Sequence, residues 1–266
     1  MIRKTLGHLY NRFFESNRRL ERIWKIAQVD FKKRYYNDVF GLMWALINPL
    51  TQIALYYFVF TRIFQRKQEN FALYLFCGII IWLAFAQATK MGSKVLINKK
   101  YLTENIQFNW IDLYISHMIS IFMGISFNFI AYFLILLISG TFLGEYFYAF
   151  PIVLITWFLL SASGAILLGL IRPIIDDIVH IWDIFIMIGF WVSGIFFSGQ
   201  FYFDNYPWFV HVNPFVGLIL NTRASLLENN ALYFSLLIEN LIFGIILYSI
   251  SVYLFKKYAK RIMEKI

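Results

Sequence analysis

Long apolar runs alternate with short polar segments along this chain of 266 residues. Each run is long enough to cross a hydrocarbon core of about 30 Å as a helix, and none has the two-residue alternation of a barrel strand. We therefore predict six membrane-spanning helices, at about 39–61, 71–89, 113–138, 149–171, 178–198 and 234–255. The predicted fold class is an all-α integral membrane protein, whose even number of spans leaves both termini on one side.

The segment before the first span, residues 1–38, is polar and basic, but within 18–36 it has helical periodicity. Apolar residues recur there at three- and four-residue steps, with basic residues on the other face. The apolar positions are Leu20, Ile23, Trp24, Ala27, Phe31 and Tyr35, and the basic ones are Arg18, Arg22, Lys25, Lys32 and Lys33. This pattern predicts an amphipathic interface helix on an anionic inner leaflet. A plain juxtamembrane anchor is the alternative.

Two connections also carry structural signals. Residues 90–106, between the second and third spans, are basic and partly apolar, which favours a short helix across the cytoplasmic end of the bundle; a solvated basic loop is the alternative. Residues 199–233, between the last two spans, contain the apolar pieces 206–212 and 214–220, each too short to cross a membrane. They predict short re-entrant helices within 199–223 that depend on cover from neighbouring protein, with a surface loop as the alternative.

Composition agrees with a membrane protein, and the basic residues orient it. Only 15% of residues are charged and 60% are hydrophobic, whereas soluble domains average about 25% charged. Of the 24 lysines and arginines, 20 fall in four segments: 1–38, 90–112, 172–177 and the basic tail 256–266. The positive-inside rule then places both termini in the cytoplasm. The same distribution explains the net charge of +9 without a nucleic-acid partner.

Motifs that would give the chain its own energy source or catalytic chemistry are missing from the sequence. It contains no G-x-x-x-x-G-K-[ST] phosphate loop, no H-E-x-x-H and no C-x-x-C, and Cys77 is the single cysteine. Glu239, near the outer end of the last span, is close to the interface, so a buried carboxylate for ion coupling is not evident. We expect no catalytic residue, metal or cofactor in this chain.

One acidic group leaves an enzymatic alternative open. Asp176, Asp177, His180 and Asp183 cluster near Arg172 at a cytoplasmic turn. Local pairing and helix capping are the simpler account. The alternative is a membrane-embedded transferase that acts on lipid-linked sugars.

Aromatic residues crowd the first, third and fifth spans, and the chain holds 30 Phe, 17 Tyr and 8 Trp. Aromatic faces stack on the apolar faces of sugar rings, although they also pack on lipid and on each other. The candidate lining of a substrate channel is Tyr56, Tyr57, Phe60, Phe127, Phe190 and Phe197.

The stretch VDFKKRYYNDVFGLMWALINPL, residues 29–50, runs from the basic segment into the first span without a loop. It resembles the signature segment of the permeases of polysaccharide-export ABC transporters, which export O-antigens, capsules and teichoic acids. The matching positions are Asp30, Phe31, Lys32, Arg34, Tyr35, Phe40, Gly41, Trp44, Ile47, Pro49 and Leu50. NPFVGLILNTR (213–223) is similar to the segment before the last span in that family, and SKVLINKK (93–100) more weakly to its cytoplasmic coupling helix. The family's proline-containing turn after the latter is absent here.

The resemblance implies a half-transporter in the cytoplasmic (inner) membrane of a bacterium. Two copies of the chain would pair with two copies of a separate ATPase, and the ATPase would bind ATP and Mg²⁺. The assembly would lie among the membrane lipids and export a lipid-linked polysaccharide. The residues it assigns to ATPase coupling are Asp30, Lys32, Arg34, Tyr35, Leu96, Ile97 and Lys99. Those it assigns to the first-span junction are Gly41, Trp44 and Pro49, and those of the re-entrant outer segment are Asn213, Pro214 and Arg223. The alternative within transport is an exporter of a small amphiphile, such as a drug or lipid.

Overall fold

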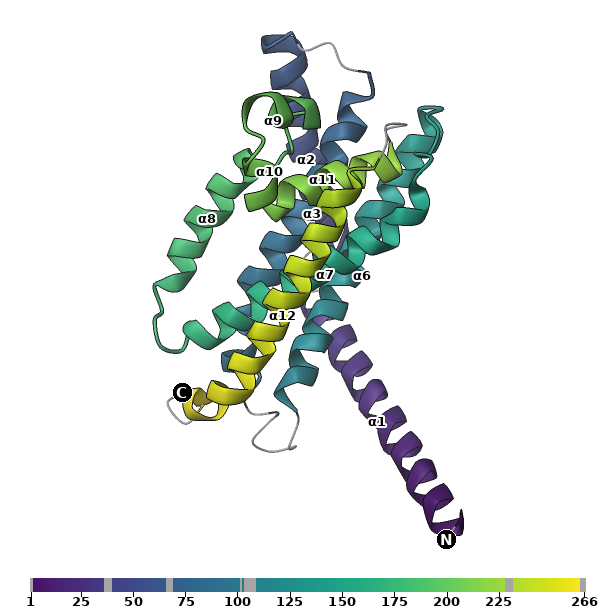
Figure 1. Ribbon diagram of the computed structural model, residues 1–266, viewed down its shortest axis with the longest axis vertical. Coiled ribbons are helices and arrows are strands. Elements are labelled where there is room, and N and C mark those ends of the chain that lie inside the picture. The colour runs from purple at the N-terminus through teal and green to yellow at the C-terminus, as the bar shows by residue number, and fades with distance from the viewer. Residues whose placement is uncertain are drawn as a thin grey trace.

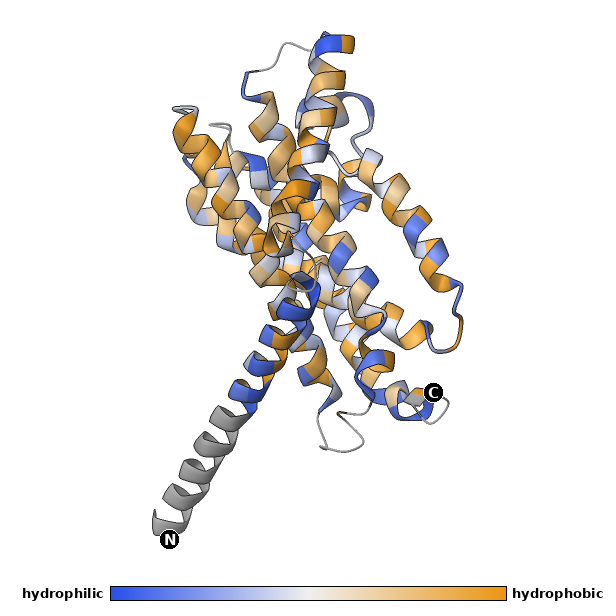
Figure 2. Cartoon of the chain, turned by 180° about the vertical axis from the view of Figure 1, so that it is seen from behind, coloured by the Kyte–Doolittle hydropathy of each residue, from blue (hydrophilic) through white to orange (hydrophobic). Residues whose placement is uncertain are grey.

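The computed structural model is a bundle of helices joined by turns, and the residues it describes include no β-strand (Figure 1). Those residues are 2–35, 40–65, 69–100, 102, 109–227 and 232–263, with the backbone alone for 2–18 and 263. The first prediction, an all-helical protein, is confirmed for this part of the chain. Figure 2 shows hydrophobic residues dominating the bundle, whereas the described turns of the first helix are largely hydrophilic.

Within the described ranges, five helical segments are long and apolar enough to cross a membrane: Gly41–Ile63, Phe71–Gly92, Trp110–Ile138, Phe147–Ile171 and Phe234–Ile262. The first consists of the 3-10 turn η1 (Gly41–Met43), α2 (Trp44–Phe58) and the π-helical turn η2 (Val59–Ile63). The others are α3 (Phe71–Gly92), α6 (Trp110–Ile138), η3 (Phe147–Ala149) with α7 (Phe150–Ile171), and α12 (Phe234–Met263). Five of the six predicted spans are thus confirmed as helices of spanning length. The last continues well into the predicted basic tail.

The remaining predicted span, 178–198, is a shorter helix in the structure. The apolar helix α8 (Ile178–Val192) has 15 residues, or about 22 Å at 1.5 Å per residue, and the prediction that it continues to residue 198 is wrong. Residues 193–197 form a bend in which Gly194 adopts a φ of +91°, a conformation that favours glycine. The helix breaks here because the bend's carbonyls are bonded by a side chain from elsewhere in the chain, as described below.

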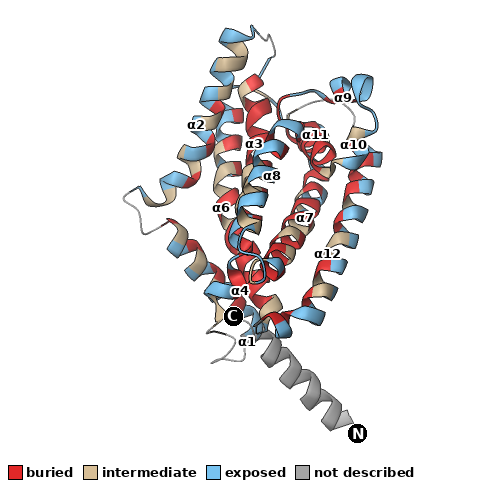
Figure 3. Ribbon diagram, turned by 90° about the vertical axis from the view of Figure 1, so that its left-hand side faces the viewer, coloured by how far each residue is buried: buried red, intermediate tan, exposed pale blue. Residues whose placement is uncertain are grey.

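The helices α3, α7 and α11 (Pro214–Leu226) form the centre of the bundle, and most of their residues are coloured as buried in Figure 3. Because α3 and α7 are apolar around most of their circumference, burial rather than amphipathicity is the packing expected of them. Trp157 of α7 is completely buried and donates its indole N–H to the carbonyl of Ile81 on α3, at 3.1 Å. This bond ties the two central helices together at mid-length.

The N-terminal helix α1 (Ile2–Tyr35) contains the predicted amphipathic segment and packs its C-terminal half against α6. Residues four apart, Ile23, Ala27, Phe31 and Tyr35, form its buried stripe. Leu20 and Trp24 belong to the predicted apolar face, yet they remain 61% and 47% exposed. The apolar face is therefore divided between a strip that packs on protein and a strip that is left uncovered.

The connection from α8 to α12 contains three helices, α9 (Gly199–Asn205), α10 (Phe209–Val212) and α11. The two half-helices predicted at 206–212 and 214–220 correspond to α10 and α11. Asn213 caps α11 by accepting a hydrogen bond from the amide of Phe215, and Pro214 occupies the first turn, where its missing N–H costs nothing. Val210 of α10 and Val216 of α11 pack this connection against Leu236 of α12.

Candidate functional site

The two segments expected to couple the chain to an ATPase meet in the structure. Asp30 of α1 and Lys99, which follows the helical turn α4 (Val95–Asn98), form a hydrogen-bonded ion pair. Only 12% of the Lys99 side chain and 17% of the Asp30 side chain are exposed. Burial lowers the pKa of Lys99, and the adjacent Asp30 carboxylate partly offsets that effect. Sixty-nine positions apart in sequence, these residues join α1 to α4 directly.

A second ion pair fixes α1 further along its length. Arg19 donates from Nε and Nη2 to the two carboxylate oxygens of Asp112, at 2.8 and 2.5 Å. Asp112 is buried in the first turn of α6, and its hydrogen bonds raise the pKa of the Arg19 guanidinium. The bidentate geometry constrains the orientation of α1 as well as its position. No sequence pattern predicted this pair, since the two residues lie in separate polar segments.

The helical turn α4 is held by apolar contacts at the end of the bundle. Val95 and Leu96 are buried in a cluster with residues of α6, α7 and the last turns of α12, among them Ile166 and Phe255. Ile97 and Lys32, also assigned to coupling, are exposed and available to another subunit. A push on α1 or α4 would therefore reach three spans through packed side chains.

At the end of α1, Tyr35 and Arg34 turn into the bundle. An ideal Cβ placed at Gly124 of α6 would lie only 2.8 Å from the Tyr35 hydroxyl oxygen, so this glycine allows α1 to approach closely. Arg34 donates from Nη2 to the hydroxyl of Ser120 at 3.3 Å. Its Nε and Nη1 are buried and have no partner among the described residues, and burial lowers the pKa of the guanidinium. Arg34 is thus a partly buried cation, two of whose nitrogens have no hydrogen-bond partner among the described residues.

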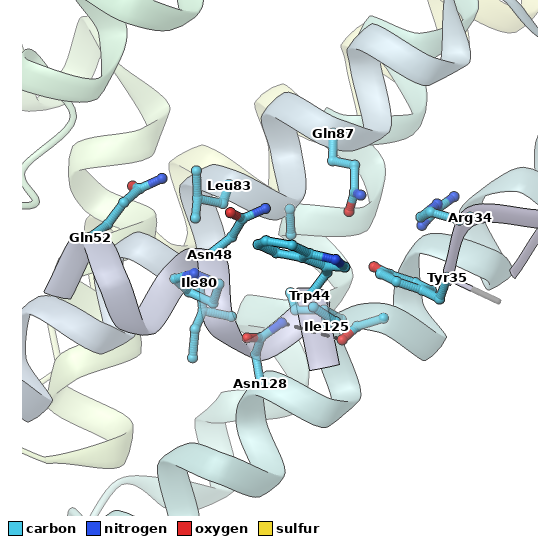
Figure 4. Close-up of a pocket in the computed structure, with 14 residues that line it drawn as sticks. Arg34, Tyr35, Trp44, Asn48, Gln52, Ile80, Leu83, Gln87, Ile125 and Asn128 are labelled. Atoms are coloured by element: carbon cyan, nitrogen blue, oxygen red, sulfur yellow. Dashed lines mark hydrogen bonds between the residues drawn. The ribbon is translucent and has the colours of Figure 1, made fainter. Parts of the chain in front are cut away.

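Arg34 lines a polar cavity of about 550 Å³ between α1, α2, α3 and α6 (Figure 4). Trp44 lies in the middle of the labelled group, with Arg34 and Tyr35 on one side and Asn48 and Gln52 on the other (Figure 4). The polar and aromatic lining residues are Arg34, Tyr35, Trp44, Asn48, Gln52, Gln87 and Asn128.

Each of the three residues assigned to the first-span junction has a clear local role. Gly41 adopts a φ of +49° just before α2, where a side chain would be strained. Trp44 and Pro49 line the polar cavity, and Pro49 lies within α2, where it interrupts the helical hydrogen bonding.

The six candidate channel aromatics do not form one surface in the single chain. Tyr56 and Phe60 of α2 gather with Phe190 around Phe196, with ring centroids 5.0 to 5.4 Å apart. The others lie in different places: Tyr57 faces Phe71, Phe127 stacks on Phe31 of α1, and Phe197 stacks on Phe201 of α9.

Arg223, predicted in the outer segment, is completely buried and stabilises the bend after α8. Its guanidinium lies 3.4 Å from the centroid of the Tyr74 ring on α3. It donates hydrogen bonds to four backbone carbonyls, those of Tyr74 (3.2 Å), Gly194 (2.8 Å), Ile195 (2.5 Å) and Phe197 (3.4 Å). Carbonyls that would otherwise be orphaned by the helix break are satisfied in this way. The role of Arg223 in this geometry is structural.

Two residues at the α7–α8 turn, Asp183 and Arg172, contact the end of α3 and the residue after it. Asp183 pairs with Lys90 of α3 at 2.9 Å, and Arg172 donates to the hydroxyl of Ser93 at 3.1 Å. Asp176 and Asp177 are exposed. The first contact ties α3 to α8, and the second ties the end of α7 to the residue after α3. The predicted pairing within the cluster is not seen among the described residues, and Asp177 at the start of α8 makes no side-chain capping bond.

The carboxamides of the polar cavity are the site residues that sequence reasoning missed. Asn48 and Gln52 lie in the first apolar run, Gln87 lies in the second and Asn128 in the third. The available signal was the four-residue spacing of Trp44, Asn48 and Gln52, which places them on one face of α2. Polar residues in membrane spans usually face the protein interior or water, so this face should have been recognised as facing inward.

Sequence comparison identifies the family of this helical membrane protein. The family of ABC-2 type transporters matches residues 21–227, so the chain belongs to it. It is a multi-pass membrane protein of a permease-subunit family whose members lack an ATPase site of their own.

Among its relatives are two O-antigen export system permease proteins RfbA of Klebsiella pneumoniae, 23% and 21% identical over 244 residues. In both, 90% of this chain and 92% of the relative are aligned. The O-antigen export system permease protein RfbA of Myxococcus xanthus is 20% identical over 210 residues, or 77% of this chain and 79% of the relative.

Proposed function

We propose that this chain is the permease subunit of an ATP-driven exporter that moves a lipid-linked polysaccharide of the O-antigen type across the cytoplasmic membrane. The observation that carries the proposal is the alignment with proteins named O-antigen export permeases over nearly the full length of both chains.

In the proposed arrangement, two copies of the chain assemble with two copies of a separate ATPase, which binds ATP and Mg²⁺. Both termini face the cytoplasm, α8 together with the residues after it completes a sixth crossing, and α9 to α11 form a re-entrant outer segment. Closure of the ATPases on ATP moves α1 and α4. The ion pairs of Asp30 with Lys99 and of Arg19 with Asp112 support this step, because they transmit displacement of α1 to the spans.

Deletion of the gene, combined with purification of the tagged chain from native membranes, tests the proposal. We expect an ATPase subunit to co-purify, and we expect the deletion strain to lose surface polysaccharide while its lipid-linked precursor accumulates in the cytoplasmic leaflet. Normal surface polysaccharide in the deletion strain would contradict the polysaccharide as substrate and favour export of a small amphiphile. Failure of any ATPase to co-purify would contradict the transporter itself.

A further inference from the structure

The polar cavity between α1, α2, α3 and α6 has features that packing alone does not explain. It lies beside spans of strongly apolar composition, yet four carboxamides line it, those of Asn48, Gln52, Gln87 and Asn128. The Oδ1 atom of Asn128 is buried without a partner among the described residues, as are Nε and Nη1 of Arg34. Unsatisfied buried polar groups are costly, so the cavity is built to hold something polar.

The lining residues come from one face of each helix. On α2, Trp44, Asn48 and Gln52 are spaced by four residues, and Pro49 lines the same cavity. On α3 and α6, Gln87 and Asn128 are the polar members of otherwise apolar lining. The group is therefore a convergent set of side chains on rigid spans, which is the arrangement that a binding site requires.

The chemistry of this set fits a sugar attached to a phosphate. A carboxamide offers both a donor and an acceptor, so it can bind neighbouring hydroxyls of a pyranose ring. The apolar face of that ring packs on an aromatic surface such as the Trp44 indole. A guanidinium with free donors binds phosphate oxygens with its planar fork. The cavity volume of about 550 Å³ lies within the range of roughly 300–1,000 Å³ typical of small-molecule sites.

Arg34 also lines a second cavity, of about 430 Å³, on the side of α1 and α4. Lys25, Lys33 and Lys99 surround this space, and Asp30 is its acidic member. Arg34 therefore stands between a basic cavity and a carboxamide cavity. A ligand with a phosphate at Arg34 and a sugar in the carboxamide cavity would match the charges of these two neighbouring cavities.

We propose that the carboxamide cavity is a binding subsite for a glycosyl phosphate, with the phosphate at Arg34 and the adjoining sugar on Trp44 among Asn48, Gln52, Gln87 and Asn128. This inference rests on the proposed export of a lipid-linked polysaccharide and assigns a recognition site for the sugar nearest the lipid. Binding there before transport would allow the permease to select glycosylated lipid over the bare lipid carrier.

The test uses the full chain, purified in nanodiscs without an ATPase, and three probes. The probes are a short polyprenyl diphosphate carrying N-acetylglucosamine, the same polyprenyl diphosphate without sugar, and free N-acetylglucosamine 1-phosphate. We expect the glycosylated lipid to bind most tightly. Equal affinity for the bare lipid would overturn sugar recognition, and equal affinity for the free sugar phosphate would assign the site to a soluble ligand instead of a lipid.

Substitutions separate the two halves of the subsite. Arg34→Gln is expected to weaken binding of both lipids by about tenfold, with partial rescue by Arg34→Lys, because a charged hydrogen bond is lost. Asn48→Ala and Gln52→Ala are expected to weaken binding of the glycosylated lipid alone. Gln200→Ala, which removes an exposed carboxamide on α9, is the matched control. Unchanged binding by folded Arg34 and Asn48 variants would overturn the proposal.

The outcome is distinguishable from that of the export experiment. If the glycosylated lipid binds as described but deletion leaves surface polysaccharide intact, the subsite stands and the proposed export fails. If deletion abolishes surface polysaccharide but the cavity variants bind normally, export stands and the subsite fails.

Discussion

The carboxylate of Asp30 accepts a hydrogen bond from the ammonium group of Lys99, and this largely buried ion pair joins α1 to the residue that follows α4. Because α1 also packs on α6 and α4 is buried against α6, α7 and α12, the pair lies where displacement of either segment reaches the spans. The proposed coupling passes through this α1–α4 joint, which Asp30 and Lys99 form.

Removing one partner of the joint should loosen the docking of α1. Lys99→Met leaves the Asp30 carboxylate mostly buried without its cation, at a cost of about 3 kcal/mol. We expect faster maleimide labelling of a cysteine placed at the buried position Ala27, measured in a Cys77→Ala background. The controls are Lys94→Met, an exposed neighbour, and labelling of a cysteine at exposed Gln28. Equal labelling rates at position 27 in the Lys99→Met and Lys94→Met proteins would show that the pair does not hold α1.

A steric prediction concerns the contact between Tyr35 and Gly124. Gly124→Ala places a methyl group 2.8 Å from the tyrosine oxygen, and overpacking of this kind costs about 1–3 kcal/mol. Tyr35→Phe removes that oxygen and leaves the nearest ring carbon at 3.6 Å, an ordinary contact. Thermal unfolding followed by size-exclusion chromatography should show a lower midpoint for Gly124→Ala and recovery in the double variant. A double variant no more stable than Gly124→Ala would refute the packing described here.

Arg223 should be intolerant even of lysine. The ammonium group of Arg223→Lys retains the charge but cannot reach four carbonyls with a planar fork, so the bend at 193–197 loses most of its bonding. We expect a loss of at least about 3 kcal/mol, seen as aggregation on mild heating. Arg62→Lys, at an exposed position, is the control and should behave as wild type. If the two variants unfold together, Arg223 does not stabilise the bend.

Asn213 has two separable contributions. Its side-chain oxygen caps α11, and its Nδ2 donates to the carbonyl of Val192 at 3.1 Å. Asn213→Ala removes both and should cost about 1 kcal/mol for the cap in addition to the lost donor. Asn213→Ser keeps a cap, so its unfolding midpoint should lie between those of Asn213→Ala and wild type. Identical midpoints for the two variants would rule out a capping role.

The spans were predictable because transfer into lipid demands long apolar helices, and five of the predicted runs coincide with such helices. The break in the helix after Val192 was not predictable, since the apolar run continues through Phe196 and Phe197. What ends the helix is the guanidinium of Arg223, which lies 29 positions from Gly194 and bonds its carbonyl. A local pattern contains no information about such a distant partner.

The candidate site was predictable only in part, because local sequence patterns do not show which distant residues meet. Family-like motifs marked Asp30 and Lys99 separately, but only the fold brings them into contact. Helical periodicity marked the apolar face of α1 without indicating that α6 covers half of it. The cavity carboxamides come from three helices, so no single segment of the sequence reveals that Asn48, Gln87 and Asn128 converge.

Charge reversal at the α1–α4 joint is the most direct test of the central claim, that this joint couples ATPase movement to export. Surface polysaccharide would be measured in a deletion strain complemented with Asp30→Lys, with Lys99→Asp, or with both changes together. We expect each single variant to reach the membrane at normal levels yet export poorly, because two like charges face each other in a low-dielectric joint. The account predicts that the double variant, which restores an ion pair of opposite polarity, recovers export. Normal export by both single variants would contradict it.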